Sequence, residues 1–340
     1  MNVCLLPCFT DAGICGKGYN PTFLGKMAVM QLVRGLHNVQ PAPAGCVATI
    51  GNYDGVHLGH RQILQRLRDR GEQLGLPSCV IIFEPQPLEF FRPEQAPVRL
   101  TRLRDKLELF AAAGVDQVLC IAFNQRFQHM TAQEFVEQVL VQALNVRHLQ
   151  VGDDFRFGCG RSGDFAYLQQ AGEQHGFTVE PTCTVSLDGQ RISSTLIRQK
   201  LMDGDFAAAE KLLGRPYSIQ GRVLHGQKLG RKLGVPTANI QLKRRHAPLH
   251  GVYMVAAHLA DGRTVPGVAN IGMRPTVEQQ NEIAHLEVHL LDFNEDIYGQ
   301  RMTVEFRHKL REEKKFASLD ELQAAIEQDI ELARKFWLVA

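Results

Sequence analysis

Short apolar segments alternate with segments of helical periodicity between residues 46 and 179. The apolar segments are rich in β-branched residues, which favour strands. In the segments that follow them, apolar residues recur every three to four positions, as on one face of a helix. This order is typical of a parallel sheet that has helices on both faces and binds its ligands at the carboxyl ends of its strands. The predicted strand and helix pairs are 47–50 with 58–74, 79–83 with 101–113, 118–123 with 132–144, and 148–151 with 164–175.

The pattern changes after about residue 213, where strand-like segments follow one another with few helices between them. Glycine, proline and charged turns separate these segments, which together predict a six-stranded antiparallel β-barrel. A last helix is predicted over residues 318–336, because Ser318 and Glu321 have the spacing of a capping box. The predicted barrel strands are Tyr217–Leu224, Thr237–Leu242, Gly251–Ala260, Thr264–Ile271, His285–Phe293 and Met302–Arg307.

The chain of 340 residues is long enough for two domains of ordinary size. We place the boundary near Gly214, which gives a first domain over residues 30–213 and a second over residues 214–340. Residues 1–29 fit neither domain, and they lack the sustained apolar core and cleavage site of a signal peptide. We expect Met30 to be the natural start and residues 1–29 to be a disordered or wrongly assigned extension.

Composition narrows the class of partner. Basic and acidic residues number 38 and 36, for a net charge of +2, so no overall field favours nucleic acid or anionic lipid. No apolar run is long enough to span a membrane. Cys79 and Cys120 lie inside apolar segments, where cysteine usually behaves as a small buried hydrophobic residue. We expect a reduced, cytoplasmic protein that binds small molecules and is a monomer or a weak homo-oligomer.

The segment 51–60 follows the first predicted strand of the sheet and opens the first helix. Its glycines allow a tight turn and close approach of a ligand, and the free N–H groups of a helix start bind phosphate. His57 and His60 are three residues apart, so both can donate hydrogen bonds to phosphate from one helix face, although two unrelated surface histidines would give the same spacing. We predict a site of adenylyl transfer from ATP. Its residues are His57 and His60, with Gly51, Asn52, Asp54, Gly55 and Gly59 around the phosphates.

Two further segments carry candidate contacts to the same substrates. Ser193, Ser194 and Thr195 place three hydroxyls at a predicted helix start, and Arg198 follows one turn later as a possible phosphate clamp. A capped helix with a solvated arginine is the alternative interpretation. The second segment, 151–158, follows a predicted strand and could contact a ribose or a second substrate.

Together, these three segments resemble the nucleotidyltransferase module of bacterial FAD synthetases. The resemblance implies an α/β nucleotidyltransferase domain with a Rossmann-like parallel sheet. It also implies that Ser194, Thr195 and Arg198 close on the ATP phosphates held by His57 and His60. The loop that contains Asp153 and Phe155 would line the pocket and contact the flavin.

Three places depart from the family pattern. Relatives often have asparagine or glutamate near Asp153 and Asp154, which leaves the individual roles in that loop open. Many relatives have phenylalanine where this chain has Tyr53. The segment 83–87 resembles a family motif that commonly has histidine where this chain has Gln86. If that position contacts flavin or adenine, the contact here must come from an amide.

A second candidate site lies in the predicted barrel. A glycine-rich basic loop precedes the turn Pro236-Thr237-Ala238-Asn239, whose hydroxyl and amide oxygens are hard ligands suited to Mg²⁺. Glu287 lies on a predicted strand and could accept a proton from a hydroxyl that attacks a γ-phosphate. A solvated basic turn and a solvated glutamate are the alternatives. The candidate phosphate contacts in the loop are Gly226, Lys228, Gly230 and Arg231.

This combination, over residues 216–337, resembles the riboflavin kinase module, a six-stranded barrel with a C-terminal helix. The resemblance implies that Thr237 and Asn239 bind Mg²⁺ and ATP and that Glu287 activates the 5′-hydroxyl of riboflavin. It also implies that Asn270 and Arg274 contact the flavin and that the terminal helix borders it.

From Met30 to Trp337 the chain is therefore similar to bifunctional riboflavin kinase/FAD synthetases. The expected reactions are phosphorylation of riboflavin to FMN and adenylylation of FMN to FAD with release of pyrophosphate, both with ATP and Mg²⁺. Three alternatives remain at this point. One module could be inactive, the protein could bind flavin without catalysis, or the first domain could adenylylate another phosphate ester.

Overall fold

The computed structural model describes residues 30–339 except 41, 226–233, 243–245 and 276–281, so the predicted extension over 1–29 lies outside the described residues. The chain forms two compact units. One unit takes in the described residues up to Pro97 together with Leu103–Ser186, and the other takes in Val98–Arg102 together with the described residues from Leu187 onward. Each unit is described below by itself.

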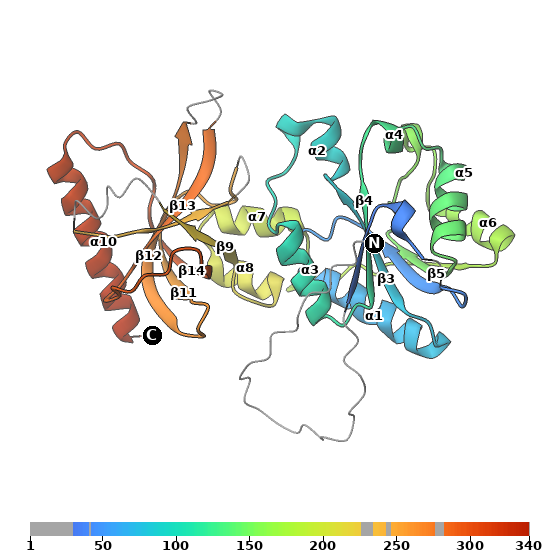
Figure 1. The fold of residues 1–340 in the computed structure, drawn as a ribbon, viewed down its shortest axis with the longest axis horizontal. Coiled ribbons are helices and arrows are strands. Elements are labelled where there is room, and N and C mark those ends of the chain that lie inside the picture. Colours follow the sequence, from blue (N-terminus) through green and yellow to red (C-terminus); the bar gives the residue numbers. More distant parts are fainter. Residues whose placement is uncertain (1–29, 41, 226–233, 243–245, 276–281, 340) are drawn as a thin grey trace, which may run out of the picture. The chain divides into compact units, whose positions relative to one another are not determined.

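A six-stranded parallel sheet forms the centre of the first unit (Figure 1). Its strands are β1 Gln31–Arg34, β2 Cys46–Ile50, β3 Ser78–Glu84, β4 Gln117–Ala122, β5 Val146–Val151 and β6 Thr178–Pro181. Its helices are η1 Leu36–Asn38, α1 Leu58–Leu74, α2 Pro87–Phe91, η2 Pro93–Gln95, α3 Leu103–Ala112, α4 Gln125–Gln128, α5 Ala132–Glu134, η3 Phe135–Ala143, η4 Cys159–Arg161 and α6 Phe165–His175. The predicted α/β fold class is confirmed, and α1 has the predicted bounds.

Helices cover both faces of this sheet. On one face, Leu64 and Leu67 of α1 and Phe110 of α3 join a buried core with Val47 of β2. On the other face, η3 and α6 pack against a second core that contains the buried cysteines Cys46 and Cys79. The helix predicted over 132–144 continues from α5 into η3, which has π-helical rather than α-helical hydrogen bonding.

The order of the strands reverses beside β2. The sheet runs β1-β4-β3-β2-β5-β6, so the chain moves from β2 to β3 and β4 in one direction and adds β5 and β6 on the other side of β2. β2 pairs in parallel with both β3 and β5. In open parallel sheets, ligands bind at the carboxyl ends of the two strands between which the order reverses. Here those strands are β2 and β5.

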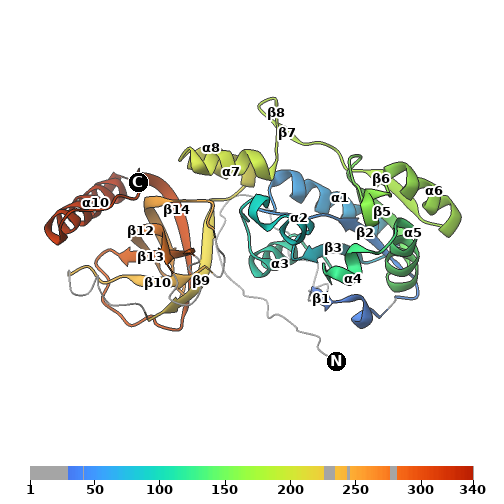
Figure 2. The same ribbon diagram turned by 90° about the horizontal axis from the view of Figure 1, so that it is seen from above.

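A closed six-stranded antiparallel barrel forms the centre of the second unit (Figure 2). Its strands are β9 Ser218–Leu224, β10 Ala238–Gln241, β11 Gly251–His258, β12 Thr264–Pro275, β13 Glu282–Leu290 and β14 Arg301–Arg311. The other elements are the two-stranded ribbon of β7 Ser186–Leu187 with β8 Gln190–Arg191, and the helices α7 Ser194–Met202, α8 Phe206–Leu213 and α10 Leu319–Val339. The predicted barrel and its C-terminal helix are confirmed.

Side chains alternate between the inside and the outside of the barrel. Ile240 on β10 and Leu286 and Val288 on β13 are buried, whereas their neighbours along each strand are only partly covered. Helix α10 packs on the outside along β12, where Trp337 contacts a small core with Val268. No helix in the described part of the chain is long and apolar enough to cross a membrane.

Candidate active sites

The loop that follows β2 lies at the reversal of the strand order. We call residues 51–57 the phosphate loop; it connects β2 to α1, and the second candidate loop, 152–158, follows β5. Thr49 of β2 and Gln150 of β5 are paired in the sheet, one residue before the end of each strand. The fold therefore brings both predicted loops to the edge of the sheet where ligands bind.

The backbone of the phosphate loop has an unusual conformation. Tyr53, Gly55 and Val56 have φ values of +48°, +83° and +41°, and the left-handed region is unfavourable for a β-branched residue such as Val56. Such strain persists only where surrounding contacts impose it, and it is concentrated at functional sites. Gly59 is also constrained, because a Cβ atom there would lie 3.2 Å from the ring of His57.

His57 and His60 form a stacked pair at the start of α1. Their ring centroids are 3.6 Å apart and their planes differ by 15°. The Nδ1 atom of His57 caps the helix by accepting a hydrogen bond from the N–H of His60 at 3.2 Å. A nitrogen that accepts a hydrogen bond carries no proton, so the neutral ring of His57 has its proton on Nε2, from which it can donate to a ligand.

The surroundings of His60 favour its neutral form. Burial is the main cause that holds the pKa of His60 well below its ordinary value, and the neighbouring His57 and the charge of Lys106 act in the same direction. The Nδ1 atom of His60 is buried without a hydrogen-bond partner in the described part of the chain. His60 can therefore donate a hydrogen bond to phosphate in its neutral form.

A hydrogen-bonded relay connects the phosphate loop to the two central strands. The hydroxyl of Thr49 donates to the carbonyl oxygen of Gln150 at 2.7 Å and lies 2.7 Å from the hydroxyl of Tyr53. Since the single proton of Thr49 is used on Gln150, Tyr53 must donate to Thr49. Burial raises the pKa of the Tyr53 phenol far above its usual value, which keeps that proton in place. The relay joins β2, β5 and the loop at one point.

We expect Thr49→Val to destabilise the protein more than Tyr53→Phe. Removal of the tyrosine hydroxyl costs one hydrogen bond, about 0.5–1.5 kcal/mol, and leaves Thr49 bonded to Gln150. Removal of the threonine hydroxyl leaves the buried Tyr53 hydroxyl without its acceptor, which costs about 1–3 kcal/mol. Thermal denaturation of the two variants measures the difference. A larger loss in Tyr53→Phe would contradict the assigned direction of donation.

The loop 152–158 presents both polar and aromatic groups. Asp153 and Asp154 are exposed, and Phe155 is half-buried. The N–H of Phe155 donates to the carbonyl of Gly152 at 3.1 Å, which closes a turn, and the Phe155 ring stacks on Phe157 at a centroid distance of 5.6 Å. The loop thus has a defined conformation with its carboxylates toward solvent.

The sequence analysis did not identify an aromatic cluster beyond the ends of β3, β4 and β5. Its members come from segments far apart in sequence, and each contacts the next at centroid distances between 5.2 and 6.3 Å. They are Phe83, Phe91, Phe123, Phe127, Phe135 and Phe157. Several of them line a cavity of about 260 Å³ together with Gly158 and Gly160. The spacing of the phenylalanines in the segment 123–135 was the sequence signal that could have revealed this cluster.

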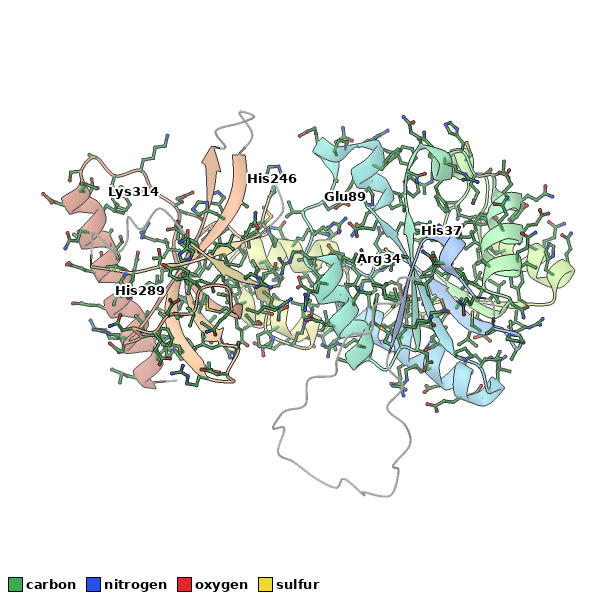
Figure 3. The ribbon with its side chains drawn as sticks, viewed as in Figure 1. Arg34, His37, Glu89, His246, His289 and Lys314 are labelled. Carbon is green, nitrogen blue, oxygen red and sulfur yellow. The ribbon has the colours of Figure 1, made fainter. Side chains whose placement is uncertain are left out.

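Gln86 lies at the start of α2, directly after β3. Its side chain is 9% exposed, and its Nε2 atom has no hydrogen-bond partner in the described part of the chain. The backbone N–H of Gln86 donates to the carboxylate of Glu89, which is labelled in Figure 3, at 2.9 Å. A buried amide that retains unused donors is available for a ligand.

The segment of Ser194, Thr195 and Arg198 belongs to the second unit. It forms the predicted helix start, where the Ser193 hydroxyl accepts a hydrogen bond from the N–H of Leu196 at 3.2 Å. Thr195 is exposed and Ser194 is half-buried. The Nε atom of Arg198 donates to the carbonyl of Val98 at 2.6 Å. The predicted closure of this segment on the ATP phosphates stays a prediction.

In the barrel, three predicted site residues form a row. Glu287 on β13 pairs directly with Asn239 on β10 and with Asn270 on β12. All three are half-buried, and the residues before and after them point into the barrel core, so the row lies on the outer face. Side chains of directly paired residues have their Cβ atoms about 4.5–5.5 Å apart, so a carboxylate lies between two amides.

The turn before β10 brings Thr237 close to this row. His289, labelled in Figure 3, fixes the turn through a contact of 2.9 Å between its Nδ1 atom and the carbonyl of Pro236. Thr237 also lines a cavity of about 230 Å³ with Phe293 and Tyr298. Gly226, Lys228, Gly230 and Arg231 lie outside the described residues, as does the side chain of Arg274 on β12.

The sequence analysis also missed His285. Its Nε2 atom lies 3.9 Å from a carboxylate oxygen of Glu287, two residues along the same strand. Both side chains point to the outside of the barrel, as alternation along a strand requires. The alternation of β13 was the signal that could have placed His285 beside Glu287.

The fold and the candidate site of each unit indicate a class of enzyme that acts on nucleotide phosphates. One site has a phosphate loop and paired histidines at the switch point of a parallel sheet, and the other has a carboxylate between amides on a barrel.

Comparison with known proteins identifies the family. The FAD synthetase family model matches residues 39–196, and the riboflavin kinase family model matches residues 213–337. The bifunctional riboflavin kinase/FMN adenylyltransferase of Pseudomonas fluorescens is 61% identical over 305 residues, which cover 90% of this chain and 97% of the relative. The protein of the same description from Escherichia coli K12 is 53% identical over 309 residues, 91% of this chain and 98% of that one.

A solved structure has the same fold over most of the chain. A crystal structure described as a macrolide-efflux protein from Streptococcus pneumoniae is 28% identical, with a TM-score of 0.73 over 89% of this chain and 98% of the other.

The chain belongs to the bifunctional riboflavin kinase/FMN adenylyltransferase family, with an N-terminal FAD synthetase domain and a C-terminal riboflavin kinase domain.

Proposed function

We propose that the barrel of this chain phosphorylates riboflavin to FMN and that the phosphate loop then serves adenylylation of FMN to FAD. The observation that carries the proposal is that each unit has its own transfer site. The stacked pair of His57 and His60 occupies one, and Glu287 between two amides occupies the other. The family assignment supports the same two reactions.

In the kinase step, Glu287 acts as the general base. It accepts the proton of the riboflavin 5′-hydroxyl as the oxygen attacks the γ-phosphorus of ATP, and ADP leaves. Asn270 and Arg274 contact the flavin, and α10 borders it, since Trp337 packs against the same small core as Val268, which lies two residues from Asn270 along β12. The phosphates of ATP lie against the basic loop residues Gly226, Lys228, Gly230 and Arg231.

The donor set of the barrel fits Mg²⁺. Thr237 offers a hydroxyl and Asn239 an amide oxygen, and both are hard oxygen donors. The described residues contain no group of three His, Cys, Asp or Glu side chains that could hold a metal by themselves, which suits an ion held partly by substrate phosphates. When bound, Mg²⁺ neutralises charge on the transferring phosphates.

In the adenylyl step, a phosphate oxygen of FMN attacks the α-phosphorus of ATP, and pyrophosphate leaves. The Nε2–H groups of His57 and His60 donate to the phosphates and stabilise the charge that develops on them. Ser194, Thr195 and Arg198 close on the same phosphates from α7. The remaining contacts come from Gly51, Asn52, Asp54, Gly55 and Gly59 of the phosphate-binding segment.

The aromatic cluster offers a surface for the ring system of FMN in this step. A flat flavin ring packs well on phenylalanine faces, and the loop with Asp153 and Phe155 adjoins the same cavity through Gly158. The unused amide of Gln86 could hydrogen-bond to the flavin or to adenine.

Phe123→Ala is expected to raise the KM for FMN in FAD formation by about tenfold and to change the KM for ATP by less than about twofold. The ring contacts Phe83, Phe91 and Phe127, so its removal enlarges the flavin cavity. Steady-state kinetics with supplied FMN measure the effect, and riboflavin kinase activity in the same preparation is the control. An unchanged KM for FMN would show that the flavin does not bind in this cavity.

We further propose that the protein acts in the cytoplasm, as a monomer or weak homo-oligomer, on ATP, riboflavin and FMN. Incubation of purified protein with riboflavin, ATP and Mg²⁺, with flavins separated by chromatography, tests the function. FMN should form first and FAD second, and chelation of Mg²⁺ should stop both. Formation of FMN alone, or of neither product, would contradict the proposal.

A further inference from the structure

A lysine occupies the core-facing side of α3. Leu103, Lys106, Leu107 and Phe110 follow the spacing of one helix face, and Leu107 and Phe110 belong to the core between α3 and the sheet. Lys106 itself is only 1% exposed. Burial of an ammonium group is unfavourable unless the protein supplies acceptors, so the contacts of Lys106 require an explanation.

The ammonium group of Lys106 contacts the phosphate loop. Its Nζ atom donates to the carbonyl oxygen of Asn52 at 2.5 Å. Asn52 directly precedes Tyr53, the first of the left-handed residues in the loop. The side chain of Asn52 is exposed, so water could also reach this part of the loop, and satisfaction of one carbonyl does not by itself require a buried lysine.

The same ammonium group acts on the histidine pair. Its positive charge is one of the causes that lower the pKa of His60, after burial and the effect of His57. Titratable groups near His60 include His57 beside it, Lys106 on α3 and the phenol of Tyr53, whose ring centroid is 4.9 Å away. The buried carboxylate of Asp54 belongs to the same loop. Lys106 therefore lies close enough to affect charge at the histidines.

We propose that Lys106 is a positioning residue for adenylyl transfer, which holds the phosphate loop through the Asn52 carbonyl and places a fixed positive charge behind the histidine pair. This inference rests on the proposed function of the phosphate loop. A fixed charge in a site shielded from water stabilises negative charge that develops on phosphates without reorganisation during the reaction. The loop, whose backbone is strained at Val56, also needs external contacts to keep one conformation.

Lys106→Met tests the proposal, because methionine keeps the length of the side chain and removes both the donors and the charge. We expect kcat for FAD formation from FMN to fall by about 10- to 100-fold. FMN formation by the same protein should stay within about twofold, and the melting temperature, compared with that of Leu107→Ala, separates loss of activity from loss of folding. NMR titration should show a higher pKa for His60, because one positive charge is gone.

Leu107→Ala is the matched control on the same helix. Leu107 follows Lys106 in the chain and has a buried side chain. Its replacement by alanine should lower the melting temperature by several degrees, while kcat for FAD formation should stay within about twofold. The proposal is overturned if Lys106→Met keeps kcat within about twofold, if its His60 titration is unchanged, or if Leu107→Ala loses kcat to the same extent.

Variants of His57 and His60 measured in parallel separate this inference from the proposed function. If the histidine variants keep FAD formation, the assignment of the adenylyl site fails, whatever Lys106→Met does. If the histidine variants lose FAD formation and Lys106→Met keeps it, only the role of Lys106 fails.

Discussion

Replacement of His57 and His60 by alanine is expected to lower FAD formation from FMN by about 10²–10³-fold or more, while FMN formation from riboflavin stays within about twofold. The two rings stack at the start of α1, where we propose that they donate hydrogen bonds to phosphate, whereas the proposed kinase residues lie on strands of the barrel. Chromatographic assay of each reaction with its own supplied substrate measures both effects in one preparation.

Two control variants separate chemistry from folding in that experiment. His57 also caps α1, and His57→Asn keeps a side chain able to cap the helix while removing the imidazole Nε2–H. We expect His57→Asn to retain the melting temperature better than His57→Ala and to lose FAD formation to a similar extent. His37→Ala, at an exposed histidine of the same unit that is labelled in Figure 3, should leave both activities unchanged. Loss of FMN formation in the histidine variants would contradict the division of labour.

Glu287→Gln is expected to produce the opposite pattern. FMN formation should fall by about 10²–10⁴-fold, because glutamine keeps the size and shape of the side chain but cannot accept the riboflavin proton. FAD formation from supplied FMN should stay within about twofold. Separate assays of the two steps measure this result.

Glu305→Gln is the matched control for the barrel. Glu305 is also a partly covered strand carboxylate with a histidine neighbour, since His258 lies 3.2 Å from it, whereas His285 lies 3.9 Å from Glu287. We expect Glu305→Gln to keep FMN formation within about threefold, because Glu305 lies outside the row of Asn239 and Asn270. Equal losses in the two variants would indicate a structural role for Glu287.

Periodicity was sufficient to predict the fold class because most elements carry their own signal. The strands β2, β3 and β4 are mainly apolar, and the barrel strands are separated by turn residues. The edge strands β1 and β6 were missed, since each has four residues and β6 is largely exposed, so neither shows a buried run. The apolar pattern of residues 135–143 does not distinguish π-helical from α-helical hydrogen bonding, so the π-helical η3 was not predicted.

The candidate sites were predictable where their residues are close in sequence. The glycines and histidines of the segment 51–60 lie within ten residues of one another, and Thr237 and Asn239 share one turn. Lys106 was missed because a single lysine on an apolar helix face gives no sign of the loop carbonyl it contacts. The Thr49–Tyr53 relay and the aromatic cluster depend on strand order, which local pattern does not reveal.

Mixing two variants that each lack one of the two activities tests the central claim most directly. The His57→Ala, His60→Ala double variant should convert riboflavin only to FMN, and Glu287→Gln should leave riboflavin almost unchanged while still converting supplied FMN to FAD. A mixture of the two proteins with riboflavin, ATP and Mg²⁺ should form FAD, because FMN made by one protein can be used by the other. The contradicting result is a mixture that accumulates FMN but forms no FAD, although the Glu287→Gln protein still converts supplied FMN. Such a result would show that the two sites do not act in sequence.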